Sequence, residues 1–286
     1  MTRQFLCLGL ALLTWGCGGS PSTPTAARPP APQPVPSGTT QLAGIVYDSA
    51  ERPLSGARVE VLDGPQAGQW TLTDGTGSYG FNGTFDDATR FRATMTGHMP
   101  AIGTRGARCA PCNPNWWLYF FLQPDGASAD LTGDYTLTIA ADPACSDLPA
   151  SARERTYTAR IAHAVYPQRP PETTFKLTVD GASFLSGYGG LDVWVAGSAV
   201  TAEVGDLHGA PGLVEQVAET TYLTFGGSIS AAVATPLRIT GSFNGLIEQC
   251  ELSEAWGGRR NCTSAPTVSR VSSCTSARHQ LTLSRQ

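Results

Sequence analysis

Residues 116–122 read WWLYFFL, with five aromatic side chains in seven positions. A short apolar and aromatic run of this kind predicts a β-strand, in which successive side chains point to opposite faces. Trp117, Tyr119 and Phe121 therefore share one face. The other face holds the alternate residues, which are Trp116, Leu118, Phe120 and Leu122. Because both faces are apolar, we expect one to fill the core of a β-sandwich and the other to be covered by a second surface or a ligand.

The composition extends the β assignment to the whole chain. The 286 residues include 32 Gly and 21 Pro, which disfavour long helices and favour short strands joined by turns. The formal net charge is -4, and Lys176 is the single lysine. Without a basic patch the chain lacks the electrostatic footprint that phosphate backbones require, so nucleic acid is not an expected partner. The sequence predicts an all-β protein.

The N-terminus predicts export. Arg3 precedes an apolar run over residues 5–13, which is too short to span a bilayer and is typical of a signal peptide. The run is followed by Thr14, Trp15, Gly16 and Cys17 and resembles the lipobox of bacterial lipoproteins, although Thr14 and Trp15 stand where small and aliphatic residues are usual. This resemblance implies that residues 1–17 form a lipoprotein signal peptide and that Cys17 is acylated. It also implies a membrane partner through the lipid, at the outer membrane or surface of a bacterial cell envelope. The alternative is ordinary cleavage near Cys17 without a lipid.

Residues 18–40 predict a disordered linker. The segment is dominated by small residues and contains seven prolines, so it lacks the apolar content of a folded core. Proline-rich segments of this kind adopt extended polyproline II and act as semi-rigid spacers. We interpret the linker as a tether that holds the folded part away from a membrane. A role as a proline-rich ligand is the alternative.

The first folded domain is expected at residues 41–124. Alternating stretches predict strands at 42–48, 58–62, 69–73, 78–82, 91–95 and 116–122. A spaced set of turn and core residues accompanies them: Gly44, Val46, Asp48, Pro53, Leu54, Gly56, Ala57, Val59, Thr73, Asp74, Gly77, Tyr79 and Phe81. In this set the chain resembles the carboxypeptidase regulatory-like domain. The resemblance implies a transthyretin-like β-sandwich, grouped with carbohydrate-binding-like folds, that serves as an accessory module without catalytic groups.

Residues 129–286 predict a second all-β domain. Its expected strands are 132–141, 155–165, 174–179, 192–196, 199–204, 220–225, 228–233, 238–247 and 279–284. This regular spacing favours an antiparallel β-barrel, whose closure removes exposed strand edges, over a second sandwich. Gly133 and Tyr135 on the first strand and Arg285 after the last resemble the Gly-x-Trp motif and late arginine of lipocalins. Tyr stands here in place of Trp.

Four cysteines of the second domain predict two disulfides. In a closed antiparallel barrel the end of the first strand lies beside the start of the last, which favours Cys145 with Cys274. Cys250 and Cys262 are then left to pair with each other. The rival pairing joins Cys145 with Cys250 and Cys262 with Cys274. Either set implies an oxidising compartment.

Cys109 and Cys112 form a CxxC motif in the first domain. A redox role needs a helix N-terminus that lowers one thiol pKa, and the sequence predicts no helix there. A zinc site needs two further ligands at compatible spacing, and only His98 is near in the sequence. We interpret the pair as a local structural disulfide.

The sequence offers no catalytic constellation. Its four histidines, at positions 98, 163, 208 and 279, lie far apart, and neither HExxH nor G-x-S-x-G occurs. We expect no enzymatic activity, no cofactor and no metal site.

The preferred hypothesis is a non-catalytic binding or adhesion module on a cell-envelope lipoprotein, with carbohydrate as the ligand class. Trp116, Trp117 and Tyr119 are the candidate sugar contacts, and packing between the domains is the alternative interpretation of these side chains. A second hypothesis is a carrier of a small apolar ligand, which requires a barrel cavity of several hundred Å³. A third is a secreted hydrolase, which requires two carboxylates about 5–10 Å apart in a cleft.

Overall fold

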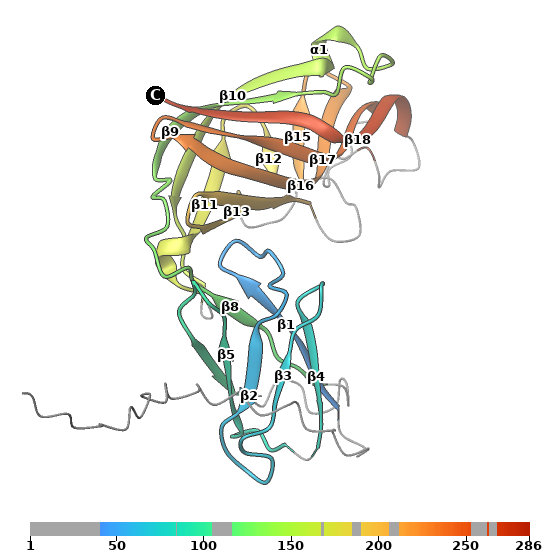
Figure 1. Ribbon diagram of the computed structural model, residues 1–286. Helices are drawn as coiled ribbons and strands as arrows, with labels where there is room; N and C mark the ends of the chain where they lie inside the picture. The colour runs from blue at the N-terminus through green and yellow to red at the C-terminus, as the bar shows by residue number, and fades with distance from the viewer. Residues whose placement is uncertain are drawn as a thin grey trace, which may run out of the picture. The chain divides into compact units, whose positions relative to one another are not determined.

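The computed structural model describes residues 41–83, 85–104, 116–166, 169–184, 190–205, 212–252, 262 and 268–286. By its internal contacts the chain divides into residues 1–32 and 33–286, and every described residue belongs to the second unit. This unit contains a β-sandwich followed by a β-barrel (Figure 1). The predicted signal peptide with Cys17, the linker, and the pair Cys109 and Cys112 lie outside the described residues.

Two four-stranded sheets form the sandwich. The first contains β4 (Ser78–Asn82), β1 (Gln41–Asp48), β7 (Trp116–Trp117) and β8 (Phe120–Leu122). In it β4 is antiparallel to β1, whereas β7 and β8 are both parallel to β1. The second sheet is antiparallel and contains β3 (Trp70–Leu72), β2 (Arg58–Val61), β5 (Arg90–Thr94) and β6 (Ala101–Thr104).

One apolar core joins the two sheets of the sandwich. Its buried side chains include Leu42, Val46, Val59, Val61, Tyr79, Phe81, Phe91, Leu118, Phe120 and Leu122. At Gly44 a Cβ would lie 1.9 Å from the carbonyl oxygen of Leu118, so glycine permits the close approach of the 116–122 segment to β1. The same carbonyl accepts a 2.7 Å hydrogen bond from the Tyr79 hydroxyl.

The predicted single strand at 116–122 is divided into β7 and β8. Between them, the Leu118 amide donates to the Ala43 carbonyl at 2.9 Å, but the Leu118 carbonyl is taken by the Tyr79 side chain rather than by a strand. This side-chain contact explains the interruption. The alternation of faces nevertheless continues through the break.

Eight of the described strands close an antiparallel barrel, as the sequence predicted. In order around the barrel they are β9 (Gly133–Ala140), β10 (Glu154–His163), β11 (Thr174–Val179), β13 (Leu191–Ala196), β14 (Ala199–Val204), β16 (Thr221–Thr235), β17 (Arg238–Leu252) and β18 (Val268–Arg285). The barrel closes where β18 pairs with β9. Short elements lie outside this ring: α1 (Ala150–Arg153), the 3-10 turn Pro171–Thr173, β12 (Ser183–Phe184) and β15 (Leu213–Gln216).

The expected break between strands at 220–225 and 228–233 is wrong, because both stretches belong to β16. Gly226 and Gly227 had indicated a turn. A Cβ on Gly227 would instead lie 2.2 Å from the Asn244 carbonyl oxygen on β17. Glycine therefore serves here to let two paired strands approach closely, and the chain continues in the same strand.

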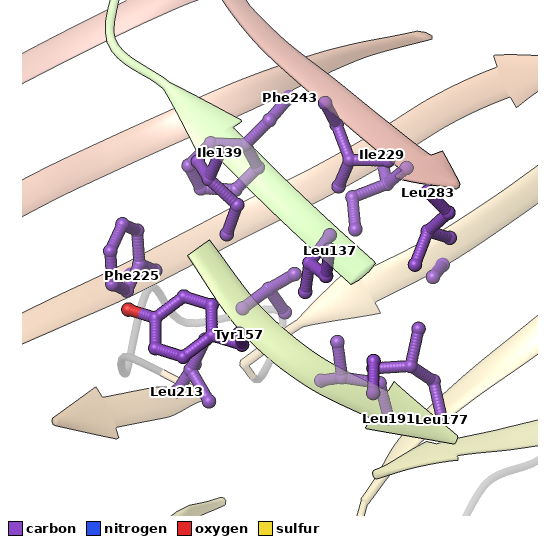
Figure 2. Close-up of a cluster of buried hydrophobic side chains, with 14 of the residues drawn as sticks. Leu137, Ile139, Tyr157, Leu177, Leu191, Leu213, Phe225, Ile229, Phe243 and Leu283 are labelled. Atoms are coloured by element: carbon purple, nitrogen blue, oxygen red, sulfur yellow. The ribbon is translucent and has the colours of Figure 1, made fainter. Parts of the chain in front are cut away.

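The barrel interior is filled by side chains (Figure 2). Ten apolar residues, among them Leu137, Phe225 and Phe243, surround a void of about 20 Å³. A void of this size has room for roughly one water molecule. It falls far below the several hundred Å³ that the carrier hypothesis requires, so this void provides no site for such a ligand.

The structure joins Cys145 to Cys274 and Cys250 to Cys262, which confirms these two predicted pairings over their rival. Cys274 lies on β18 opposite Ile247 of β17, and Cys145 follows the end of β9. The first disulfide therefore fastens the strand pair at which the barrel closes. Its two cysteines are 129 residues apart in the chain.

Three residues selected from the sequence meet where the barrel closes. The Arg285 guanidinium lies 5.9 Å from the ring centroid of Tyr135 and donates to the Thr132 carbonyl. A Cβ on Gly133 would lie 2.9 Å from Nε of Arg285, so glycine leaves the space that the guanidinium occupies. The two ends of the barrel sequence are thus joined by a side-chain contact as well as by strand pairing.

Candidate ligand-binding surface

The outer face of the first sandwich sheet exposes large aromatic side chains. Trp117 is 51% and Tyr119 49% exposed, whereas Leu118, Phe120 and Leu122 are buried in the sandwich core. This agrees with the alternation predicted from the sequence. The Trp116 side chain lies outside the described residues.

Four aromatic rings follow one another across this face, and we name them the aromatic ladder: Trp117, Tyr119, Tyr47 and Phe121. Ring centroids of Trp117 and Tyr119 are 6.1 Å apart, those of Tyr119 and Tyr47 6.4 Å, and those of Tyr47 and Phe121 5.8 Å. The planes of these neighbours differ by only 15–26°. The rings therefore present similarly oriented faces along a line.

Strand pairing brings the ladder together. Tyr47 of β1 lies directly opposite Phe121 of β8 in a parallel register. At the other end, Trp117 pairs with Ala43, which in turn pairs with Gly80 of β4. Ala43 and Gly80 are small, so the sheet surface beside the indole is low and leaves the indole accessible.

The Phe121 end of the ladder is covered by other side chains of the chain. The Arg169 guanidinium carbon lies 4.1 Å from the centroid of Phe121 and 4.9 Å from that of Trp194 on β13. Arg169 also forms an ion pair with Glu51. Intramolecular packing, the alternative interpretation of the aromatic segment, therefore holds for Phe121 but leaves Trp117 and Tyr119 open.

The turn after β1 positions Glu51. The buried Asp48 carboxylate accepts hydrogen bonds from the amides of Ala50 and Arg52 and from Nε of Arg52. Glu51 adopts a left-handed conformation with φ of 58°, which places it in the centre of this tight turn. In the two residues before it, the Ser49 hydroxyl donates to the Val195 carbonyl at 2.6 Å and the Ala50 carbonyl accepts from the Thr201 hydroxyl.

A cleft of about 460 Å³ opens beside the ladder. Six residues line it: Tyr47, Glu51, Tyr119, Phe121, Trp194 and Glu203. Partial burial raises the pKa of Glu203, and the nearby charge of Glu51 raises it further. Burial, Tyr119 and Glu51 also raise the pKa of Tyr47. The cleft thus combines four aromatic rings with two carboxylates that influence each other.

Sequence reasoning found Trp117 and Tyr119 but missed Tyr47, Glu51, Trp194 and Glu203. The alternation of β1 contained a signal for Tyr47, because Leu42 and Val46 face the core and Tyr47 must then face outward. For the other residues no such signal exists, since Glu51 and Glu203 are separated by about 150 positions in the chain.

Two further polar clusters in the barrel have internal partners that satisfy them. The buried Glu215 accepts hydrogen bonds from the Arg155 guanidinium and, at 2.8 Å, from the Tyr157 hydroxyl. In the second cluster, Nδ1 of the buried His279 accepts from the Asp142 amide at 3.0 Å, and Nε2 donates to the Gly245 carbonyl at 3.2 Å. Both arrangements are explained by the need to pair buried polar groups.

The Asp142 carboxylate accepts from the Ser276 hydroxyl at 2.6 Å, from the Ala144 amide at 3.0 Å and from Nε of Arg278 at 2.9 Å. These bonds lower the pKa of Asp142 to about 2. In the part of the chain that the structure describes, no group of three or more His, Cys, Asp or Glu side chains is placed to hold a metal ion. Among the same residues no helix is long and apolar enough to cross a membrane.

Comparison of the chain with family models, with curated proteins and with solved structures gives no match.

Proposed function

We propose that the chain is a non-catalytic binding module that holds carbohydrate on the aromatic ladder. The main support is the pair of half-exposed rings, Trp117 and Tyr119, whose faces continue the line set by Tyr47. The face of an aromatic ring carries negative electrostatic potential, and the C–H groups on the face of a pyranose are weakly positive and apolar. A row of such rings therefore suits successive sugar rings of a chain.

The exposure of these side chains also supports a binding role. Contiguous exposed apolar surface is uncommon on soluble proteins and marks interaction sites. The ladder lies on the outer face of a sheet whose inner face already forms the sandwich core, so the fold does not need these rings for its own core. Ala43 and Gly80 keep the neighbouring surface low enough for a flat ligand.

The proposed cellular setting is the bacterial cell envelope. In this proposal Cys17 holds the lipid that anchors the protein, and the proline-rich linker extends the folded part away from the membrane. A tethered module with a sugar-binding face would attach the cell to a polysaccharide or hold an envelope glycan. The resemblance to the carboxypeptidase regulatory-like domain, with its carbohydrate-binding-like fold, agrees with this ligand class.

A glycan array and polysaccharide pull-downs with the full chain test the proposal. We expect binding that Trp117→Ala and Tyr119→Ala each weaken, while Trp116→Ala tests the third residue predicted from the sequence. Ile102→Ala is the matched control, because Ile102 is 62% exposed but lies on β6 of the other sheet. Binding that is insensitive to Trp117 and Tyr119, or absent for every glycan, would overturn the proposal.

A further inference from the structure

Three of the residues that line the cleft, Phe121, Trp194 and Glu51, already hold a cation of the chain. The Arg169 guanidinium lies over the rings of Phe121 and Trp194 and pairs with the Glu51 carboxylate. Aromatic faces attract cations, and the attraction grows when the cation is partly removed from water. The Arg169 side chain is only 14% exposed, so this contact is largely desolvated.

The charges facing the cleft do not balance. Arg169 neutralises Glu51, but among the described residues Glu203 has no ion-pair partner. Glu203 projects from β14, where its paired neighbour is the uncharged Ser228. The cleft therefore retains one uncompensated carboxylate beside aromatic rings, and a positively charged group is the complementary occupant.

We propose that this cleft binds the protonated amine of an amino sugar, with Glu203 as its acceptor and the rings of Tyr47 and Trp194 beside it. This inference rests on the proposed carbohydrate function and narrows its ligand class to amine-bearing glycans. The sugar ring itself stacks on the ladder, and the amine reaches the cleft that adjoins Tyr47 and Tyr119.

The volume and chemistry of the cleft agree with this occupant. About 460 Å³ lies within the usual range of ligand sites, ~300–1,000 Å³, and exceeds what one ammonium group needs. The uncompensated Glu203 carboxylate disfavours sugars that carry carboxylate or sulfate groups, because like charges repel. N-acetylated sugars keep the stacking face but lack the positive charge that Glu203 would pair with.

Calorimetric titration with two oligosaccharides of equal length, one of glucosamine and one of N-acetylglucosamine, tests the inference. We expect the full chain to bind the glucosamine oligomer roughly tenfold more tightly, because only this oligomer carries ammonium groups that Glu203 can accept. Glu203→Gln should abolish this preference and leave affinity for the N-acetylated oligomer unchanged. Glu219→Gln is the matched control, since Glu219 is an exposed glutamate on the turn before β16 that does not line the cleft.

The outcomes separate the two proposals. Equal affinity for both oligomers would overturn the amine site and leave sugar binding on the ladder intact. A preference that survives Glu203→Gln would overturn the assignment to this cleft. If neither oligomer nor any glycan of the array binds, the proposed carbohydrate function fails as well.

Discussion

Replacing Trp117 by alanine should weaken glycan binding about eightfold, a magnitude that follows from the exposure of its side chain. A tryptophan side chain covers about 150–250 Å² when fully buried, so at 51% exposure about 100 Å² of Trp117 remains open. A sugar ring that stacks on one face takes about half of that area. At ~25 cal/mol per Å² this burial is worth about 1.2 kcal/mol. Since each 1.4 kcal/mol is a factor of ten, the dissociation constant should rise about eightfold.

The same substitution has a cost in stability that the assay must separate from binding. The covered half of the indole packs beside Tyr119, and its loss lowers the free energy of unfolding by at most about 2.5 kcal/mol. Circular dichroism and thermal unfolding should therefore show a folded Trp117→Ala protein with a moderately lower midpoint. Affinity is then measured by calorimetry well below that midpoint.

Ile102→Ala provides the comparison, because it removes an exposed apolar side chain from the opposite sheet. We expect its affinity to equal that of the parent. If folded Trp117→Ala binds the same glycan with unchanged affinity, or if Ile102→Ala loses as much, the ladder is not the binding surface and the reasoning from ring exposure is refuted.

Three other predictions concern stability and anchoring. The pKa of Asp142 is lowered from 3.8 to about 2, so the contribution of its carboxylate to stability is complete above pH 3.8 and is lost as the pH falls towards 2. Asp142→Asn should remove this part of the acid-unfolding curve, and an unchanged curve would contradict the prediction. Removing the disulfide with Cys145→Ser and Cys274→Ser should lower the free energy of unfolding by about 2–5 kcal/mol in denaturant titrations, because the disulfide links positions 129 residues apart. An unchanged unfolding midpoint would argue against stabilisation by this cross-link. Cys17→Ser should abolish metabolic labelling with a fatty acid and release the protein from membranes, whereas retained label would disprove acylation at Cys17.

The sequence was informative where structure depends on strict local geometry. The period of two in a strand placed Trp117 and Tyr119 outward and Leu118 inward, even though the strand itself is interrupted. Antiparallel closure predicted that the end of β9 lies near the start of β18, which favoured Cys145 with Cys274 over the rival pairing that the structure excludes. Both inferences need only the direction of neighbouring strands and no knowledge of distant packing.

The local structure could not be predicted in the same way at residues whose type fits more than one backbone conformation. Gly226 and Gly227 suit a turn and also a close approach of paired strands. The second interpretation applies, because they pair with Leu246 and Gly245 of β17 and a Cβ on Gly227 would lie 2.2 Å from the Asn244 carbonyl oxygen. Glu51 gave no local sign of its left-handed turn, a conformation more usual for Gly or Asn. Such positions depend on partners far away in the chain.

Arg169 shows why one half of the ladder is closed and the other open. Its guanidinium covers the ring of Phe121 and forms an ion pair with Glu51, so this single side chain both buries the Phe121 end of the ladder and neutralises one acid of the cleft. Among the described residues, Glu203 has no cationic partner, and the rings of Tyr119 and Trp117 remain half exposed. A ligand that stacks on Trp117 and Tyr119 and offers a cation to Glu203 would repeat the contacts that Arg169 already makes with Phe121, Trp194 and Glu51. Trp117, Tyr119 and Glu203 therefore offer the same kinds of group, aromatic faces and a carboxylate, but no arginine side chain in the described part of the protein occupies them.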